Sequence, residues 1–190
     1  MIRKFFFATA LLACGVYSAG TTVSANDEPA GNGKSTPAEL RALRAMVGEW
    51  DVSVEVWPNG KDKPSIQFAG TETNRPFGQH WIASDLVTTY QDREVRVHSI
   101  IGYDLDQKSL VGTIVDHGPY AATMKGELDA DTKTIHWTTH AKTPDGKPIL
   151  QKTSVTQMTG KQRVLTMMVP GKTEGEMTEV MKIEYTKKAE

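Results

Sequence analysis

Three charged residues, Glu72, Arg75 and Asp85, stand in segments that neighbouring strands could bring together. Such a cluster at the mouth of a barrel could fix the polar head of a ligand while Trp81, Tyr103 and apolar neighbours hold its body. The alternative is structural, because an arginine–carboxylate pair can lock the register of a hairpin. Glu72 and Arg75 have opposite strand parity, so both point inward only if a bulge separates them. We favour the structural role for the charged trio.

Asp116 and His117 are adjacent and could act as an acid–base pair, with His98 and Tyr120 nearby. Adjacent strand residues point to opposite faces, which argues against a bond between the two side chains. Neither a nucleophile-elbow motif nor a Ser-His-Asp order accompanies them. We therefore predict no catalytic residue, and the candidate ligand-binding set is Glu72, Arg75, Trp81, Asp85, Tyr103 and Asp116.

The histidines do not predict a metal or haem site. His136 and His140 lie in a β-forming segment, where four residues span about 13 Å, too far to share one zinc ion. Nitrobindin-like haem barrels use a histidine late in the chain, and no histidine follows His140. We expect no metal and no cofactor.

The first 25 residues are typical of a signal peptide. Arg3 and Lys4 precede an apolar run over residues 5–16, and Val23-Ser24-Ala25 offers a cleavage site. The apolar run is too short for a membrane span. We expect a periplasmic or secreted protein, and the alternative is a lipoprotein anchored through Cys14.

The mature chain has no basic excess. Without Arg3 and Lys4 it carries 20 basic and 23 acidic residues. Nucleic-acid binding is therefore not expected, because it depends on neutralising phosphates. Cys14 is the sole cysteine, so cleavage at Ala25 would leave neither disulfides nor thiol chemistry.

One helix is predicted after a flexible leader over residues 26–35. Thr36 and Glu39 could form a capping box around Pro37, and Gly48 could end the helix. Its apolar stripe consists of Leu40, Leu43, Met46 and Val47.

The chain from Trp50 onward alternates between strands and short turns. The run from Ile100 to Asp116 is typical of a hairpin, since two β-branched strands flank a short polar turn. About ten such strands follow one another, and closing them into a barrel would remove two exposed edges. We predict an all-β, antiparallel up-and-down barrel of about ten strands with one N-terminal helix, forming a single domain over residues 36–188.

Several segments form a specific combination: Val47-Gly48-Glu49-Trp50, Gly70-Thr71-Glu72-Thr73-Asn74-Arg75, Trp81-Ile82-Ala83-Ser84-Asp85, Gly102-Tyr103-Asp104 and Val111-Gly112-Thr113-Ile114-Val115-Asp116. In this combination the chain resembles the bacterial domain-of-unknown-function family 1579. The resemblance implies a calycin-like barrel, similar to lipocalins and fatty-acid-binding proteins, and it supplies no activity. Gly48-x-Trp50 also resembles the lipocalin entry motif, whose tryptophan packs across the closed barrel base. His117-Gly118 departs from the Ser-Met-like pair expected in relatives.

These observations favour a non-catalytic barrel that binds a small, largely apolar ligand in the cell envelope. This hypothesis depends partly on fold analogy. Two alternatives stay open: an acid–base enzyme that uses carboxylates or histidine in the barrel cavity, and an interaction module whose barrel is fully packed.

Overall fold

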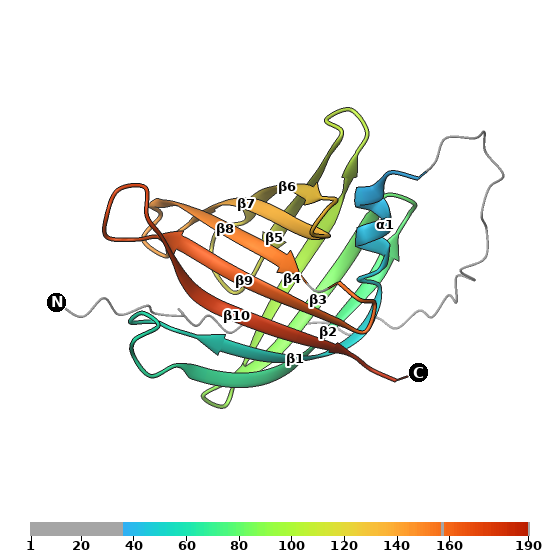
Figure 1. Cartoon of the computed structure of the whole chain (residues 1–190). Coiled ribbons are helices and arrows are strands. Elements are labelled where there is room, and N and C mark those ends of the chain that lie inside the picture. Colours follow the sequence, from blue (N-terminus) through green and yellow to red (C-terminus); the bar gives the residue numbers. More distant parts are fainter. Residues whose placement is uncertain (1–35, 157, 190) are drawn as a thin grey trace.

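Ten antiparallel strands close into one barrel, and helix α1 lies at one of its ends (Figure 1). The computed structural model describes residues 36–156 and 158–189. The predicted signal peptide, the leader and Cys14 lie outside the described residues. Each strand pairs with its neighbours along the chain, and the first strand pairs with the last. The predicted all-β up-and-down barrel with an N-terminal helix is confirmed.

The structure contains ten strands, in agreement with the predicted number of about ten. The elements are α1 (Ala38–Arg44), β1 (Gly48–Val56), β2 (Ile66–Phe77), β3 (Trp81–Tyr90), β4 (Arg93–Asp104), β5 (Ser109–Val115), β6 (Ala122–Asp129), β7 (Thr134–Lys142), β8 (Pro148–Thr156), β9 (Gln162–Pro170) and β10 (Met177–Lys187).

Period-two alternation places one face of each strand inside the barrel. In β1, for example, Trp50, Val52 and Val54 are buried while the residues between them are exposed. The inward side chains form two apolar clusters, one around Trp50 and one around Leu43 of α1. The described pairing is regular apart from one register shift, between Glu179 and Met181 of β10. Away from that shift, the strand parity of a residue shows which face of the barrel wall it occupies.

The structure corrects the predicted start of the helix. The N-cap of α1 is Pro37, and no side chain caps this end, so the capping box of Thr36 and Glu39 is not formed. Pro37 has a ψ of 143°, outside the helical region, so the helix begins at Ala38 and Thr36 lies one residue too early to cap it. In the described residues no helix is long and apolar enough to cross a membrane.

The predicted end of the helix also differs. Gly48 is the first residue of β1, with φ of +122°, and Ala45 is the C-cap. The amides of Met46 and Val47 donate to the carbonyls of Leu43 and Arg44, at 2.9 and 3.2 Å. These hydrogen bonds join residues three apart, as in a 3₁₀ turn, and they satisfy two of the last carbonyls of the helix. A glycine cap is therefore not required.

Two turns at the α1 end share one sequence pattern. In the β4–β5 turn, Asp104 Oδ1 accepts hydrogen bonds from the amides of Asp106 and Gln107, and Lys108 has a positive φ of 49°. The β6–β7 turn repeats this arrangement from Asp129 to Lys133. The bonds from the Gln107 backbone are the main reason why the pKa of Asp104 is lowered.

Candidate functional site

The interior of the barrel, which we call the lumen, is closed at the α1 end. Leu43 of α1 is fully buried there, and Trp50 is 1% exposed. The Trp137 ring lies against Gly126, where an added Cβ would meet the ring at 2.6 Å. Glycine at this position therefore leaves room for the tryptophan. We call this packed layer the base of the lumen.

A buried arginine crosses the base. The guanidinium carbon of Arg163 lies 4.2 Å from the centroid of the Trp50 ring and 4.0 Å from that of Tyr185. Its Nη2 donates to Oε1 of Glu72 in an ion pair, and both side chains are buried. Stacking and charge pairing together offset the cost of removing this cation from water.

Asn74 completes this arrangement. Its Nδ2 donates to Oε1 of Glu72 at 2.5 Å and to the carbonyl of Met46 at 2.9 Å. The indole Nε1 of Trp50 donates to the same Met46 carbonyl at 2.9 Å. We call Trp50, Glu72, Asn74, Arg163 and Tyr185 the base cluster. It joins β1, β2, β9 and β10 to the segment that follows α1.

Burial dominates the electrostatics of the base cluster. It raises the pKa of Tyr185 well above 10.0, and the neighbouring charge of Glu72 raises it further. Arg163 Nη1 is buried and has no hydrogen-bond partner among the described residues. Because Glu72 and Arg163 are closed off from solvent and neutralise each other, their geometry supports a structural role.

The other half of the lumen is packed less completely. Inward-facing apolar side chains beyond the base are part-exposed, although they share the strand faces of fully buried residues. This group, which we call the upper lumen, consists of Val56, Phe68, Leu86, Val97, Ile114, Met124, Ile149, Met167, Val169 and Met181. Thr88, Thr139, Thr153 and Gln151 add polar groups to the same faces. Solvent therefore reaches an apolar surface inside the barrel wall.

The six predicted site residues do not form one cluster. Glu72 is buried in the base, and Tyr103 packs against the core inside the barrel. Trp81 has the opposite parity to buried Ile82 and lies against Gly102 on the outer face. Asp116 is exposed beyond β5 and accepts a hydrogen bond from the Gly118 amide at 2.6 Å.

Arg75 and Asp85 do meet, but on the outside of the barrel. Their side chains lie 3.9 Å apart, and Asp85 Oδ1 also contacts His98 Nδ1 at 2.7 Å. Arg75 is largely exposed, so this pairing is weak. Strand parity, as the sequence predicted, keeps Arg75 and Glu72 on opposite faces.

Arg163 is the residue that sequence reasoning missed. It occupies an inward position of β9, two residues before Leu165. A charged residue in line with apolar inward residues was the available signal, since such a residue needs a buried partner. Its partner Glu72 lies 91 residues earlier, and only closure of the barrel brings the two together.

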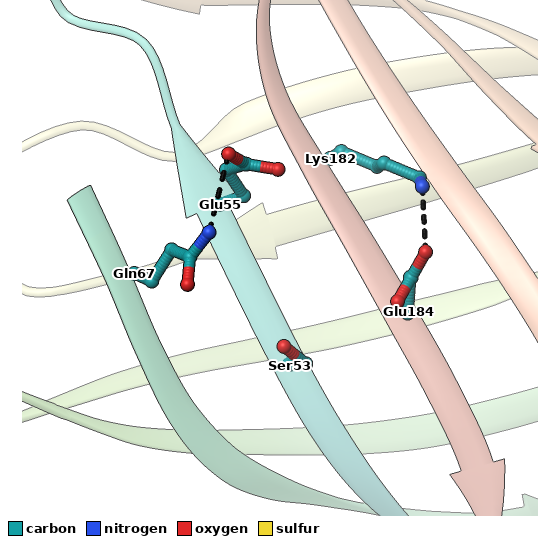
Figure 2. A pocket seen from close by; sticks show the side chains of 5 residues that line it. All are labelled: Ser53, Glu55, Gln67, Lys182 and Glu184. Atoms are coloured by element: carbon teal, nitrogen blue, oxygen red, sulfur yellow. Dashed lines mark hydrogen bonds and ion pairs between the residues drawn. The ribbon is translucent and has the colours of Figure 1, made fainter. Parts of the chain in front are cut away.

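A polar depression of about 260 Å³ lies on the outer wall, between β2, β1 and β10 (Figure 2). Glu55 accepts from Gln67 at 3.3 Å, and Lys182 pairs with Glu184 at 2.5 Å. The hydrogen bond to Ser65 is the main cause of the lowered pKa of Glu55. Lys182 and Glu184 pair with each other and Glu55 has neutral hydrogen-bond partners, an arrangement typical of a solvated strand face.

Comparison with protein families identifies the family of this chain. A family model described as "Protein of unknown function (DUF1579)" covers residues 36–187, which run from just before α1 to the end of β10. The chain belongs to the DUF1579 family. The suspected family is thereby confirmed.

A structural comparison of this DUF1579 member supports the fold. The crystal structure of Rv2717c from M. tuberculosis superposes with a TM-score of 0.61 and 8% sequence identity. The match covers 82% of this chain and 100% of that chain. At this identity the similarity shows the fold alone. No curated protein matches the chain.

Proposed function

We propose that this barrel binds a small, largely apolar molecule in the upper lumen. The observation that carries the proposal is the contrast in packing between the two halves of the barrel. The base contains side chains that are almost fully buried, such as Trp50 and Leu43, whereas inward apolar side chains such as Leu86, Val97 and Met124 are part-exposed. Placing an apolar ligand there would remove this surface from solvent, which stabilises the complex.

The polar groups of the upper lumen are few and mostly uncharged. Thr139 and Thr153 are buried, and Gln151 is part-exposed on an inward face. Such groups can orient a ligand through one or two hydrogen bonds. The base cluster, whose charges are already paired, would serve as the rigid floor. This arrangement favours binding over acid–base catalysis, which needs an ionisable group within reach of the substrate.

Native mass spectrometry of protein purified from its own cells without detergent tests this function. We expect a co-purifying small molecule that is released by organic solvent. A clean apo mass, together with no thermal shift across a panel of lipids and apolar metabolites, would contradict the proposal.

We also propose that the domain works outside the cytoplasm. The support is the sequence pattern of residues 1–25, with its basic start, apolar run and small-residue cleavage site. The intact mass of the protein from fractionated cells tests this. A chain that starts at Asn26 in the soluble envelope fraction is expected. A lipidated chain that starts at Cys14 would establish the anchored alternative, and an uncleaved cytoplasmic chain would contradict export.

A further inference from the structure

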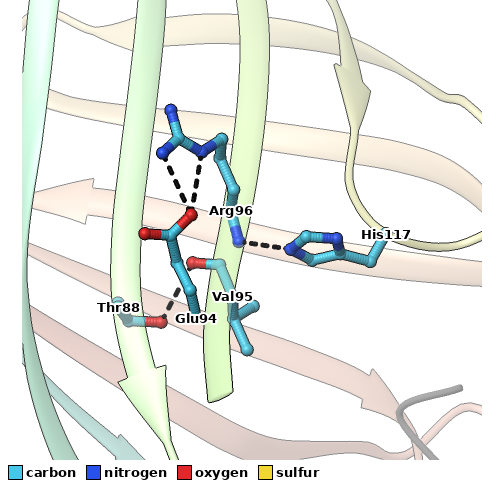
Figure 3. Close-up of polar contacts among 5 residues, drawn as sticks. All are labelled: Thr88, Glu94, Val95, Arg96 and His117. Carbon is cyan, nitrogen blue, oxygen red and sulfur yellow. Dashed lines mark hydrogen bonds and ion pairs between the residues drawn. The ribbon is translucent and has the colours of Figure 1, made fainter. Parts of the chain in front are cut away.

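Residues 116–121 join β5 to β6 at the end of the barrel opposite α1, and we call them the rim strap. β5 pairs with β4 up to Val115, which lies opposite His98. Beyond that point the side chain of His117 continues the pairing, because its Nε2 accepts a hydrogen bond from the Arg96 backbone amide at 2.8 Å (Figure 3). An imidazole thus takes the place of a backbone acceptor where the strand ends.

The C-terminal part of the rim strap contacts the β7–β8 hairpin through Tyr120. Lys142 Nζ lies 5.1 Å from the centroid of the Tyr120 ring. The Tyr120 hydroxyl lies 3.1 Å from the position of an added Cβ on Gly146. The strap therefore runs along the rim from β4 to β7 and is held at both ends by side chains.

The hydrogen bond at His117 requires one protonation state. Nε2 can accept from the Arg96 amide only when the imidazole is neutral with its proton on Nδ1. A protonated ring carries N–H groups on both nitrogens, so the Nε2–H group of His117 would face the N–H group of Arg96 and the hydrogen bond would be lost. Histidine side chains take up this proton in the range of about pH 5 to 8.

The charged and titratable groups near His117 come from three places. They are Glu94, Arg96 and His98 of β4, Asp116 and Tyr120 of the strap, and Lys142 of β7. Glu94 pairs with the Arg96 guanidinium at 3.0 Å, and Asp116 accepts from the Gly118 amide. Thr88 Oγ1 also bonds the Val95 carbonyl beside them, at 3.5 Å. These bonds leave the Arg96 amide as the hydrogen-bond partner of the imidazole.

We propose that the rim strap is a pH-operated latch at the mouth of the upper lumen. Neutral His117 holds the strap against β4, and protonation of His117 releases it. Release in acid would open the rim and speed the exchange of a bound apolar molecule. The control of ligand exchange rests on the proposed function, whereas the release of the strap does not.

Nuclear magnetic resonance of the mature protein tests the latch without any ligand. At pH 8 we expect the Nδ1–H tautomer of His117 in long-range ¹H–¹⁵N spectra. After correction for intrinsic rates, the Arg96 amide should exchange about fivefold faster at pH 5 than at pH 8, as loss of one hydrogen bond predicts. An Nε2–H tautomer at pH 8, or equal corrected exchange at both pH values, would overturn the latch.

Two variants separate the latch from general effects of acid. His117→Ala should show the fast Arg96 exchange at both pH values. His140→Ala removes an exposed histidine from the outer face of β7 and should keep the wild-type pH response. Loss of the response in both variants would contradict the assignment to His117.

Release of N-phenyl-1-naphthylamine, a neutral apolar probe, tests ligand exchange. Stopped-flow dissociation should be about fivefold faster at pH 5 than at pH 8, and equally fast at both pH values in His117→Ala. Identical rates in all samples would overturn control of exchange by the strap. Strap release without any probe binding would instead overturn the proposed function.

Discussion

At the scale of single residues, the base cluster holds two opposite charges away from solvent, because the side chains of Glu72 and Arg163 pair with each other and both are buried. Either charge without the other would be a buried, unpaired charge, which is costly. Glu72 was singled out from the sequence as a charged residue near Arg75, and the structure gives it a different arginine as its partner. Strand parity predicts that Glu72 and Arg75 point to opposite faces unless a bulge separates them, and the described β2 strand has them on opposite faces. The pairing with Arg163 could not be predicted, because it depends on which strands become neighbours when the barrel closes.

Replacing Glu72 with leucine should destabilise the protein strongly. The variant leaves the Arg163 cation buried without a carboxylate, so we expect the free energy of unfolding in urea to fall by about 3–5 kcal/mol. A Glu72→Leu, Arg163→Met double variant should regain most of this loss, because no unpaired charge remains. As a control, Asp85→Asn on the outer face should cost less than about 1 kcal/mol. The pairing would be contradicted if the loss of stability in the double variant equalled the sum of the losses in Glu72→Leu and in Arg163→Met alone.

Because the hydroxyl of Tyr185 is buried, we expect the free energy of unfolding to fall at alkaline pH. Burial and the charge of Glu72 raise its pKa in the folded state well above 10.0, so the unfolded chain releases this proton first. Stability from this group is therefore intact below about pH 10 and falls by about 1.4 kcal/mol per pH unit above it. Urea unfolding from pH 8 to 11 should show this slope in wild type. Tyr185→Phe should show a smaller slope, and identical slopes would contradict burial of the hydroxyl.

At the scale of elements, the strands were predictable and the ends of the helix were not. Alternation over six or more residues identifies a strand even when its ends shift by a residue or two. The predicted capping box is not formed because Pro37, with a non-helical ψ of 143°, is itself the N-cap, which leaves Thr36 one residue before the capping position. Local sequence signals of this kind are easily outweighed by one backbone constraint.

The repeated turns give a prediction at this scale. Lys108 has a positive φ, which a residue with a Cβ adopts at a cost. Lys108→Gly should raise the free energy of unfolding by about 0.5–1 kcal/mol, because relief of strain exceeds the added chain entropy. The matched change Lys125→Gly, on the exposed face of β6, should instead lower it by about 0.5–1 kcal/mol. Equal losses in thermal or urea unfolding would contradict the strain at Lys108.

At the scale of the whole molecule, the closed barrel was predictable because ten alternating strands would otherwise expose two edges. The difference in burial between the base and the upper lumen was not predictable, since it depends on how far each inward side chain reaches into the barrel. Trp50, Trp137 and Arg163 are buried at one end, and the apolar side chains of the upper lumen are part-exposed at the other. This asymmetry gives the barrel a floor and a mouth, and the proposed binding site lies between them.

Filling the upper lumen tests this proposal most directly. Met124 faces inward above the Trp137 layer, and its neighbour Lys125 is exposed on the outer face. Fluorescence titration with N-phenyl-1-naphthylamine should show saturable binding to wild type and to Lys125→Trp. Met124→Trp, once shown to be folded by circular dichroism, should bind at least about tenfold more weakly because its ring occupies the site. Equal binding by the two tryptophan variants, or no binding by wild type, would contradict a ligand site in the upper lumen.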